Sequence, residues 1–516
     1  MLQTLNNWIN RHYRISTFLL GSLAVQALPP FYHWYVLFIS FSMLLLLLNR
    51  ANNLKQAFAC GYWFGCGYFA FGFAWVNNAL LVHPEQTGWL IPITFLASGL
   101  FFGLFFGFPT MLAYLFKSLS LRYIALAAWI VIFEWLRSWF LTGFPWNLLG
   151  TCLAFDLRLI QTASIFGTYG LSLLVMIISA VPALWLNERT IAKFLLCIGI
   201  IGGLLTINIS LGNYRINKLK SSADSSYKIR LVQPSIPQAA KWSTDMLQMN
   251  FQDYINLTLS QPLDDIDMVI WGETASPFAL DRDKKALSQI LSATPRHGHL
   301  LTGMIRYENN YYGGWNAFNS SLIIDSSGII EDSYDKSHLV PFGEYIPLKH
   351  LLPDFIKPIT NIIGTFKSGS GPRTINIPGI PYFGIQICYE IIFPHHIISS
   401  TPKPRWLVNL TNDGWYGASS GPYQHLVNAQ LRAIEEGITI VRSANSGIST
   451  VINRYGLILA SLKLQHRGIL DISLPRQMSI YTIYNYAGNI PVFLVCLSLL
   501  LFCLYRNTKL KINSQQ

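Results

Sequence analysis

The chain has 516 residues, of which 52% are hydrophobic and only 12% are charged, so a single water-soluble globule describes it poorly. Residues 1–210 hold 14 of the 62 charged side chains, and the remaining 306 residues hold the other 48. The composition therefore predicts an apolar N-terminal part that lipid must solvate, followed by a longer part of ordinary polarity.

The net charge of +12 is unevenly distributed along the chain. Residues 1–210 carry 10 Lys and Arg against 4 Asp and Glu, whereas residues 211–505 carry 24 against 21. The polar part is nearly neutral, and the excess of basic residues flanks the apolar spans. This distribution is typical of residues that set membrane topology and contact anionic lipid. We expect no nucleic-acid partner.

Hydropathy in windows of about 19 residues predicts seven membrane spans before residue 211 and an eighth near the C-terminus. The spans lie at residues 13–30, 32–48, 56–77, 88–116, 122–142, 162–186, 191–210 and 489–505. A cleavable signal peptide is the alternative for the first span. No A-x-A-like cleavage site precedes Pro29, so we expect this span to be retained.

Lysine and arginine residues fall in every second loop between the predicted spans. By the positive-inside rule the N-terminus is cytoplasmic, the polar part lies on the opposite side, and the basic C-terminal tail returns to the cytoplasm. The expected organisation is an N-terminal membrane domain of about seven spans, an extracytoplasmic domain, a C-terminal span and a cytoplasmic tail, at residues 1–212, 225–475, 488–506 and 507–516.

The polar part alternates short β-rich runs with helical stretches. The predicted strands lie at 228–233, 267–271, 299–305, 321–325, 383–388, 406–410, 438–443 and 449–453, and the predicted helices at 244–260, 284–293 and 423–436. DSSG at 325–328 and NRYG at 453–456 are typical of hairpin turns. This mixture predicts layered α/β packing, with a sheet buried beneath helices.

The seven cysteines are scattered mainly through apolar segments and show neither a disulfide framework nor zinc-ligand spacing. The histidines also lack metal-ligand spacing, so we expect no metal and no cofactor. Only Cys388 lies well inside the polar part. If that part faces an oxidising compartment, a lone thiol there indicates a side chain kept for its reactivity.

Three segments place reactive groups at strand ends. Glu273 follows a predicted strand in WGETASPF, Lys336 lies in the loop YDKSHLVPFGEYIP, and Cys388 ends an apolar strand in GIQICYEIIFP. Each residue alone is typical of a solvated loop or a small core position. Together they provide a base, a cation and a nucleophile, which is the minimum set for acyl transfer through a thioester.

The order of these motifs, with TNDGWYG at 411–417 and GPYQH at 421–425, resembles the nitrilase superfamily. The spans on both sides of the polar part and KWST at 241–244 are similar to the bacterial apolipoprotein N-acyltransferase family. The likeness covers nearly the whole chain. It implies an αββα sandwich carried by a polytopic α-helical membrane domain of about eight spans, located in the bacterial inner membrane with a periplasmic catalytic domain.

The resemblance implies a role for each of the three reactive residues. Glu273 is expected to be the general base, Lys336 the oxyanion stabiliser and Cys388 the nucleophile. The family commonly has a proline just before the catalytic glutamate, whereas this chain has Gly272. Glycine allows that turn more backbone freedom, so the placing of Glu273 depends on its surroundings.

The resemblance also implies supporting and substrate-binding residues. Glu344 is expected to support the triad, while Tyr389 and Glu390 shape the loop that carries the cysteine. Trp242 is expected on a mobile arm over the site.

The reaction implied by the family is ping-pong. Cys388 takes an acyl chain from a phospholipid, expected to be phosphatidylethanolamine, and the thioester then acylates the α-amine of a diacylglyceryl-cysteine at the N-terminus of an apolipoprotein. An α-amine with a pKa near about 8 is partly neutral at cellular pH, and Glu273 would remove its remaining proton. The expected partners are these two substrates and the membrane, and we expect a monomer.

Two other functions remain open. A membrane-tethered nitrilase-like amidase would use the same triad on small amides, although hydrolysis alone does not require eight spans. A transporter or scaffold would be expected to carry intramembrane charges and internal repeats, and neither is evident. Glu134 and Arg137, one helical turn apart in a predicted span, either pair with each other or contact a lipid headgroup.

Overall fold

The computed structural model describes residues 11–217, 224–310, 314–351, 358, 365–399, 401–475 and 481–513. The chain forms two compact units. One is helical and comprises Met1–Asn77, Gln86–Lys218 and Thr482–Gln516, and the other comprises Asn78–Glu85 and Leu219–Tyr481. Each unit is described by itself below.

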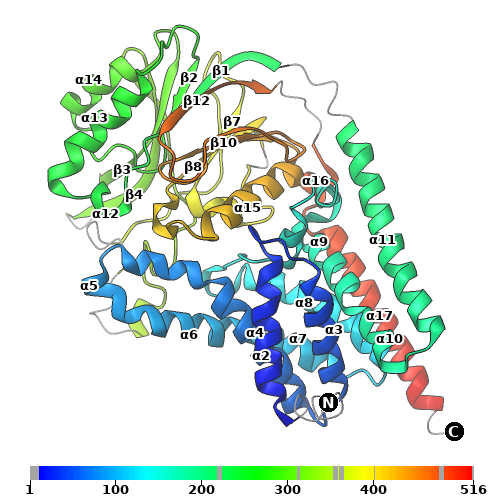
Figure 1. Cartoon of the computed structure of the whole chain (residues 1–516). Coiled ribbons are helices and arrows are strands. Elements are labelled where there is room, and N and C mark those ends of the chain that lie inside the picture. Colours follow the sequence, from blue (N-terminus) through cyan, green and yellow to red (C-terminus); the bar gives the residue numbers. More distant parts are fainter. Residues whose placement is uncertain are drawn as a thin grey trace. The chain divides into compact units, whose positions relative to one another are not determined.

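The helical unit has a helix at each of the eight predicted span positions (Figure 1). They are α2 (Tyr13–Ala24), α3 (Val36–Asn49), α4 (Leu54–Gly72), α6 (Ile91–Phe102) with α7 (Leu104–Tyr114), α8 (Leu119–Arg137), α9 (Ala163–Ala180) with α10 (Pro182–Glu188), α11 (Ile191–Asn217) and α17 (Ile490–Asn513). Further described residues of this unit form short 3-10 turns between these helices.

Five helical segments among the described residues are long and apolar enough to cross a membrane. They are Pro84–Tyr114, Leu119–Arg137, Ala163–Glu188, Ile191–Asn217 and Ile490–Leu510. The helices α2 and α3 have only 12 and 14 residues, which is shorter than the roughly 20 residues of a typical span. The prediction of an α-helical membrane domain is confirmed, while the count of about eight spans stays a prediction.

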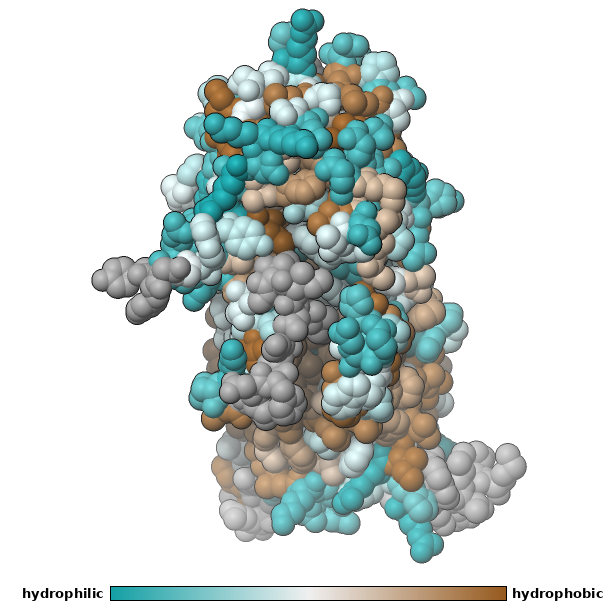
Figure 2. Space-filling view, turned by 90° about the vertical axis from the view of Figure 1, so that its left-hand side faces the viewer, coloured by the Kyte–Doolittle hydropathy of each residue, from teal (hydrophilic) through white to brown (hydrophobic). Residues whose placement is uncertain are grey.

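Small residues let α4 pack closely against its neighbours. A Cβ on Gly61 would lie 2.1 Å from the Thr110 hydroxyl of α7, and a Cβ on Gly67 would lie 2.1 Å from the Phe18 carbonyl of α2. The helix backbones therefore approach to distances that only glycine permits, as in other membrane helix pairs. On the face shown in Figure 2, hydrophobic residues cover much of the flank of the helical unit.

Two charged residues in the C-terminal turns of α8, Glu134 and Arg137, bind the chain segment that follows the helix. The Arg137 guanidinium donates to the Phe144 carbonyl and, at 2.8 Å, to the Trp146 carbonyl. A carboxylate oxygen of Glu134 accepts from the backbone N–H of Leu149 at 2.8 Å. Both side chains are buried, and they form hydrogen bonds with backbone groups that lipid cannot hydrogen-bond. Their role is therefore structural.

The second unit is a sandwich of two six-stranded sheets. The first has the order β12-β1-β2-β3-β4-β5, and the second the order β11-β10-β9-β8-β7-β6. The strands of the first are β1 (Asp224–Gln233), β2 (Met268–Ile270), β3 (His299–Asn309), β4 (Trp315–Asp325), β5 (Ile330–Asp335) and β12 (Gly468–Pro475). Those of the second are β6 (Thr374–Ile375), β7 (Phe383–Ile387), β8 (Trp406–Thr411), β9 (Thr439–Ala444), β10 (Thr450–Ile452) and β11 (Ile458–Ser461).

Each sheet has a parallel centre and antiparallel edges. The strands β1, β2 and β3 run parallel, as do β7, β8 and β9. The predicted hairpin turns at 325–328 and 453–456 are confirmed, because they join the antiparallel pairs β4–β5 and β10–β11. The carboxyl ends of parallel strands are where loops carry functional groups in such sheets.

Helices cover the outer faces of the two sheets, giving an αββα sandwich (Figure 1). The helices α13 (Leu247–Thr258) and α14 (Lys284–Ile290) cover the first sheet, and α15 (Gly421–Glu436) covers the second. All three correspond to predicted helices. The fold class implied by the resemblance is therefore confirmed, whereas the strand pattern alone indicated only one sheet beneath helices.

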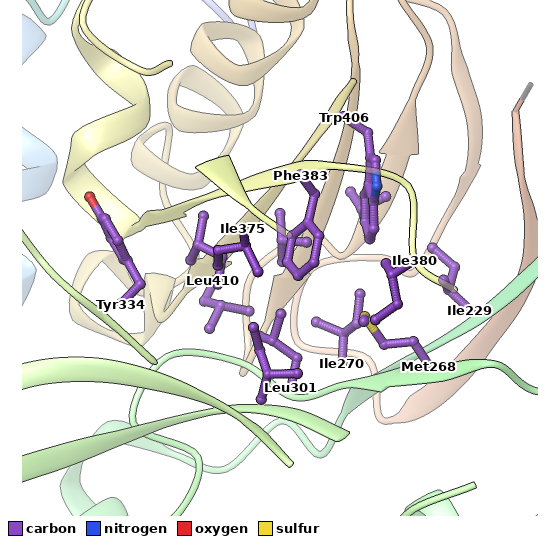
Figure 3. Packing of buried hydrophobic residues seen from close by; sticks show 14 of the residues in the cluster. Ile229, Met268, Ile270, Leu301, Tyr334, Ile375, Ile380, Phe383, Trp406 and Leu410 are labelled. Carbon is purple, nitrogen blue, oxygen red and sulfur yellow. The ribbon is translucent and has the colours of Figure 1, made fainter. Parts of the chain in front are cut away.

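The main core lies between the two sheets. Figure 3 shows Met268, Ile270 and Leu301 of the first sheet facing Phe383 and Leu410 of the second. The neighbours of these residues along β2, such as Val269, point instead toward the helical layer. A strand buried on both faces reads as a continuous apolar run, which is why DMVIW and GIQIC were recognisable in the sequence.

Candidate active site

Glu273 lies in the turn that follows β2, and its surroundings hold this turn in place. A Cβ on Gly303 of β3 would lie 2.4 Å from the Thr274 nitrogen and 2.9 Å from the Glu273 Cα, so β3 presses directly against the turn. Thr274 itself has a φ of 45°, which is uncommon for a residue with a side chain. The close packing offsets the backbone freedom that Gly272 allows.

The Lys336 ammonium lies between two carboxylates. Its nitrogen donates to an oxygen of Glu344 at 2.9 Å and lies 3.5 Å from an oxygen of Glu273. Burial by itself disfavours the charged lysine, but Glu344 and then Glu273 outweigh it, and the pKa of Lys336 is raised above its ordinary value. Lys336 is therefore a fixed positive charge at neutral pH.

Asn319 of β4 joins the same two carboxylates from the other side. Its side-chain nitrogen donates to Glu273 at 2.8 Å and to Glu344 at 3.0 Å. The backbone N–H of Lys336 in turn donates to the Asn319 carbonyl at 2.8 Å. Sequence reasoning missed Asn319, and the only local signal was a polar side chain within the apolar strand AFNSSLII.

Cys388 directly follows β7 and begins the short helix η10 (Cys388–Ile392). Its φ of 52° lies in the left-handed region, which a residue with a side chain rarely adopts. Burial raises the pKa of the Cys388 thiol to about 12; the negative charge of Glu273 adds to this effect, and the positive charge of Lys336 opposes it. The thiol is thus protonated at neutral pH, and the charges of Glu273 and Lys336 both act on it.

Glu390 connects the lysine loop to the cysteine turn. One carboxylate oxygen accepts from the backbone N–H groups of Ser337 and His338, at 2.7 and 3.1 Å, and from the Tyr334 hydroxyl at 2.9 Å. The other accepts from the N–H of Ile387 at 2.7 Å. A single buried side chain therefore fixes two loops that are about fifty residues apart in the sequence.

Tyr389 and Trp242 occupy different surroundings. The Tyr389 ring is buried and packs against the rings of His338 and Phe393, with centroids 5.7 and 5.1 Å away. Trp242 is half-buried and follows α12 (Gln238–Lys241), where it packs against a small apolar cluster that includes Phe366. The structure does not test whether Trp242 belongs to a mobile arm.

A buried polar network holds the backbone of Cys388 and was also missed from the sequence. The His425 ring lies 2.8 Å from an oxygen of Asp413 through Nδ1 and 3.1 Å from the Cys388 carbonyl oxygen through Nε2. The Arg442 guanidinium donates to the other Asp413 oxygen at 2.7 Å. The motifs TNDGWYG and GPYQH contributed to the resemblance, and the network explains why their Asp and His lie close together.

Within the described ranges, no cluster of three or more His, Cys, Asp or Glu side chains has a geometry that would hold a metal ion. The carboxylates beside Cys388 bind Lys336 and Asn319 instead. The chemistry available at this place is therefore that of a buried thiol, a carboxylate and an ammonium.

Two protein families match this chain. Residues 20–181 match the apolipoprotein N-acyltransferase N-terminal domain, and residues 228–484 match the carbon-nitrogen hydrolase family. Among solved structures, a CN-hydrolase superfamily protein from Xanthomonas campestris is 19% identical with a TM-score of 0.37, covering 52% of this chain and 96% of that one. The family match over residues 228–484 identifies the sandwich unit as a carbon-nitrogen hydrolase domain.

Curated relatives match almost the whole length. The apolipoprotein N-acyltransferase of Rhodopseudomonas palustris is 36% identical over 95% of this chain and 94% of its own. That of Bradyrhizobium diazoefficiens is 38% identical over 93% of each chain. The chain belongs to the apolipoprotein N-acyltransferase family, and it is a membrane protein.

Proposed function

We propose that this protein transfers an acyl chain from a phospholipid, through a thioester on Cys388, to the N-terminal amine of a diacylglyceryl-cysteine apolipoprotein. The observation that carries the proposal is the Lys336 ammonium between Glu273 and Glu344, acting on the buried Cys388 thiol. This arrangement belongs to a chain whose relatives are named apolipoprotein N-acyltransferases and whose other unit is rich in apolar helices.

In the first half-reaction, the Cys388 sulfur attacks the ester carbonyl of the phospholipid. Because the thiol has a pKa of about 12, it needs a base, and Glu273 takes the proton as the S–C bond forms. The Lys336 ammonium stabilises the tetrahedral oxyanion. Collapse breaks the ester C–O bond, and the lysophospholipid leaves with the proton that Glu273 returns.

In the second half-reaction, the neutral α-amine of the apolipoprotein attacks the thioester carbonyl. Glu273 accepts a proton from the attacking nitrogen, and Lys336 again faces the developing oxyanion. Cleavage of the C–S bond releases the N-acylated product, and the proton returns to the Cys388 sulfur. The thiol is thereby restored without any external cofactor.

The supporting residues act by holding these groups in place. Glu344 keeps Lys336 charged and oriented, and Glu390 fixes the Lys336 loop against the Cys388 turn. Tyr389 packs beside the nucleophile, and we assign Trp242 to substrate contact. Buried and mutually bonded groups of this kind pre-organise a site for the transition state.

We further propose the topology expected from the charge pattern. The catalytic domain over 225–475 is periplasmic, and the protein is a multi-pass inner-membrane monomer with both termini in the cytoplasm. The membrane domain over 1–212 and the span over 488–506 anchor it, the tail over 507–516 is cytoplasmic, and phosphatidylethanolamine is the acyl donor.

A two-substrate assay tests this function. Purified full-length protein is mixed with phosphatidylethanolamine and a diacylglyceryl-cysteine peptide, and the peptide mass is followed. We expect the peptide to gain one acyl chain, and we expect Lys336→Ala to abolish this gain while the matched exposed-lysine variant Lys228→Ala retains it. Release of ammonia from small amides without acyl transfer would instead identify an amidase.

A further inference from the structure

A second lysine, Lys241, is buried beside Glu273. It is the last residue of α12, and it is only 5% exposed. Its ammonium donates to the backbone carbonyl of Glu273 at 2.9 Å. Burying an ammonium is costly unless its charge interacts favourably with the surroundings, so this placement requires an explanation.

The two buried lysines have different partners. Lys336 forms ion pairs with two carboxylates, whereas no carboxylate of the described residues lies within 4 Å of the Lys241 nitrogen. Burial lowers the pKa of Lys241 to about 8, while the charges of Glu273 and Cys388 oppose this change. The Lys241 charge therefore acts on the same two side chains that exchange a proton.

The segment that carries Lys241 is fastened at both ends. The Asn250 side chain of α13 donates to the Ala240 carbonyl at 3.0 Å. At the other end, the Asn412 side chain donates to the Gln238 side chain at 2.7 Å. Since α12 is held in this way, the Lys241 ammonium has a fixed position relative to the Glu273 turn.

The Glu273 turn is thus held from two directions. The glycine at position 303 allows β3 to press against the turn, and Lys241 binds the turn's carbonyl. We propose that Lys241 is a positioning residue for Glu273: it fixes the backbone of the base and supplies a second positive charge beside the base and the thiol. This inference rests on the proposed function, because it assigns Glu273 as the base.

The physical consequence concerns the chemical step of acylation. A base displaced by about 1 Å slows that step by about a hundredfold, whereas binding of the phospholipid does not require the base to be in place. Removing Lys241 should therefore lower the maximal rate and leave the half-saturating phospholipid concentration unchanged. A residue that only supports the fold would lower the fraction of folded protein instead.

The test measures the rate of acyl adduct formation on Cys388 when full-length protein is mixed with phosphatidylethanolamine at a series of concentrations. We expect Lys241→Met to lower the maximal rate by about a hundredfold and to leave the half-saturating concentration unchanged. Lys241→Arg keeps the charge and the N–H donors and is expected to recover most of the maximal rate. Lys228→Met, at an exposed lysine paired with Asp265, is the matched control and is expected to leave the rate unchanged.

Lys241→Gln is a second neutral variant, which retains an N–H donor and is expected to show a loss of maximal rate if Lys241→Met does not fold. A wild-type maximal rate in either neutral variant, or a raised half-saturating concentration without a loss of maximal rate, would overturn the proposal. A loss in Lys241→Arg equal to that of the neutral variants would overturn it as well. Failure of the wild-type protein to form the adduct would instead refute the proposed function.

Discussion

The Lys336 ammonium is closer to Glu344 than to Glu273, at 2.9 Å against 3.5 Å. The lysine charge is therefore held mainly by Glu344, which also accepts from the backbone N–H of Val340 at 2.8 Å. This division leaves Glu273 less engaged with the lysine than Glu344 is. It matches the proposal that Glu344 supports the lysine and that Glu273 is the base.

Replacing the supporting carboxylate tests this division. In Glu344→Gln, Lys336 loses its nearest negative charge, and Glu273 becomes its only carboxylate partner among the described residues. A base locked in an ion pair accepts a proton less readily. We expect acyl adduct formation to fall by about 10² to 10³ fold, measured by intact-protein mass spectrometry. Adduct formation at the wild-type rate would show that Glu344 does not support the lysine.

The high pKa of Cys388 predicts low reactivity toward reagents that require a thiolate. With a pKa of about 12, the buried thiol carries less thiolate at pH 8 than a free cysteine with a pKa of about 8.5. Alkylation of Cys388 by iodoacetamide should therefore be slower than alkylation of a cysteine peptide, and should accelerate as the pH rises. Faster alkylation than that of the peptide would mean that the resting enzyme holds a thiolate and needs no base.

The bond network of Glu390 predicts a loss of both stability and activity. Glu390→Ala leaves the buried N–H group of Ile387 and the part-buried N–H groups of Ser337 and His338 without their acceptor. Each unsatisfied buried group costs about 1 to 3 kcal/mol. We expect a lower thermal transition in detergent and a strong loss of acylation, because the lysine loop and the cysteine turn are no longer joined. An unchanged transition temperature would contradict this assignment.

The close approach at Gly303 predicts that one added methyl group disturbs the site. In Gly303→Ala, the new Cβ would lie 2.4 Å from the Thr274 nitrogen, so the backbone of the turn must move. A displacement of Glu273 by about 1 Å is expected to slow acylation by about a hundredfold. Gly202→Ala is the matched control, since a Cβ there has no atom within 4 Å. Equal rates for the two variants would show that the turn tolerates displacement.

The elements predicted best from the sequence are those in which every residue along the element is buried. The strands β2 and β7, which end at Ile270 and Ile387, are buried on both faces, so they appear as short apolar runs. Cys388 directly follows β7 and Glu273 lies three residues after β2, which is why both could be proposed early. The strands β6 and β11 have only 2 and 4 residues, too few for a pattern. Pairing of β12 with β1 joins segments about 240 residues apart, and no local signal reports it.

The missed site residues share one physical cause. Lys241 and Asn319 act on Glu273 from 32 and 46 residues away, through contacts that exist only after folding. Lys241 lies in the motif KWST and Asn319 in the strand AFNSSLII, but neither local sequence shows that the side chain contacts Glu273. Tertiary packing, rather than motif spacing, brings them to the carboxylate.

Formation of an acyl-enzyme tests the central claim most directly. The full-length protein is incubated with phosphatidylethanolamine alone, and each cysteine peptide is examined by mass spectrometry. We expect an acyl adduct on Cys388 that hydroxylamine removes and that does not form in Cys388→Ala. An adduct on another residue, or complete transfer to the acceptor peptide by Cys388→Ala, would contradict the account.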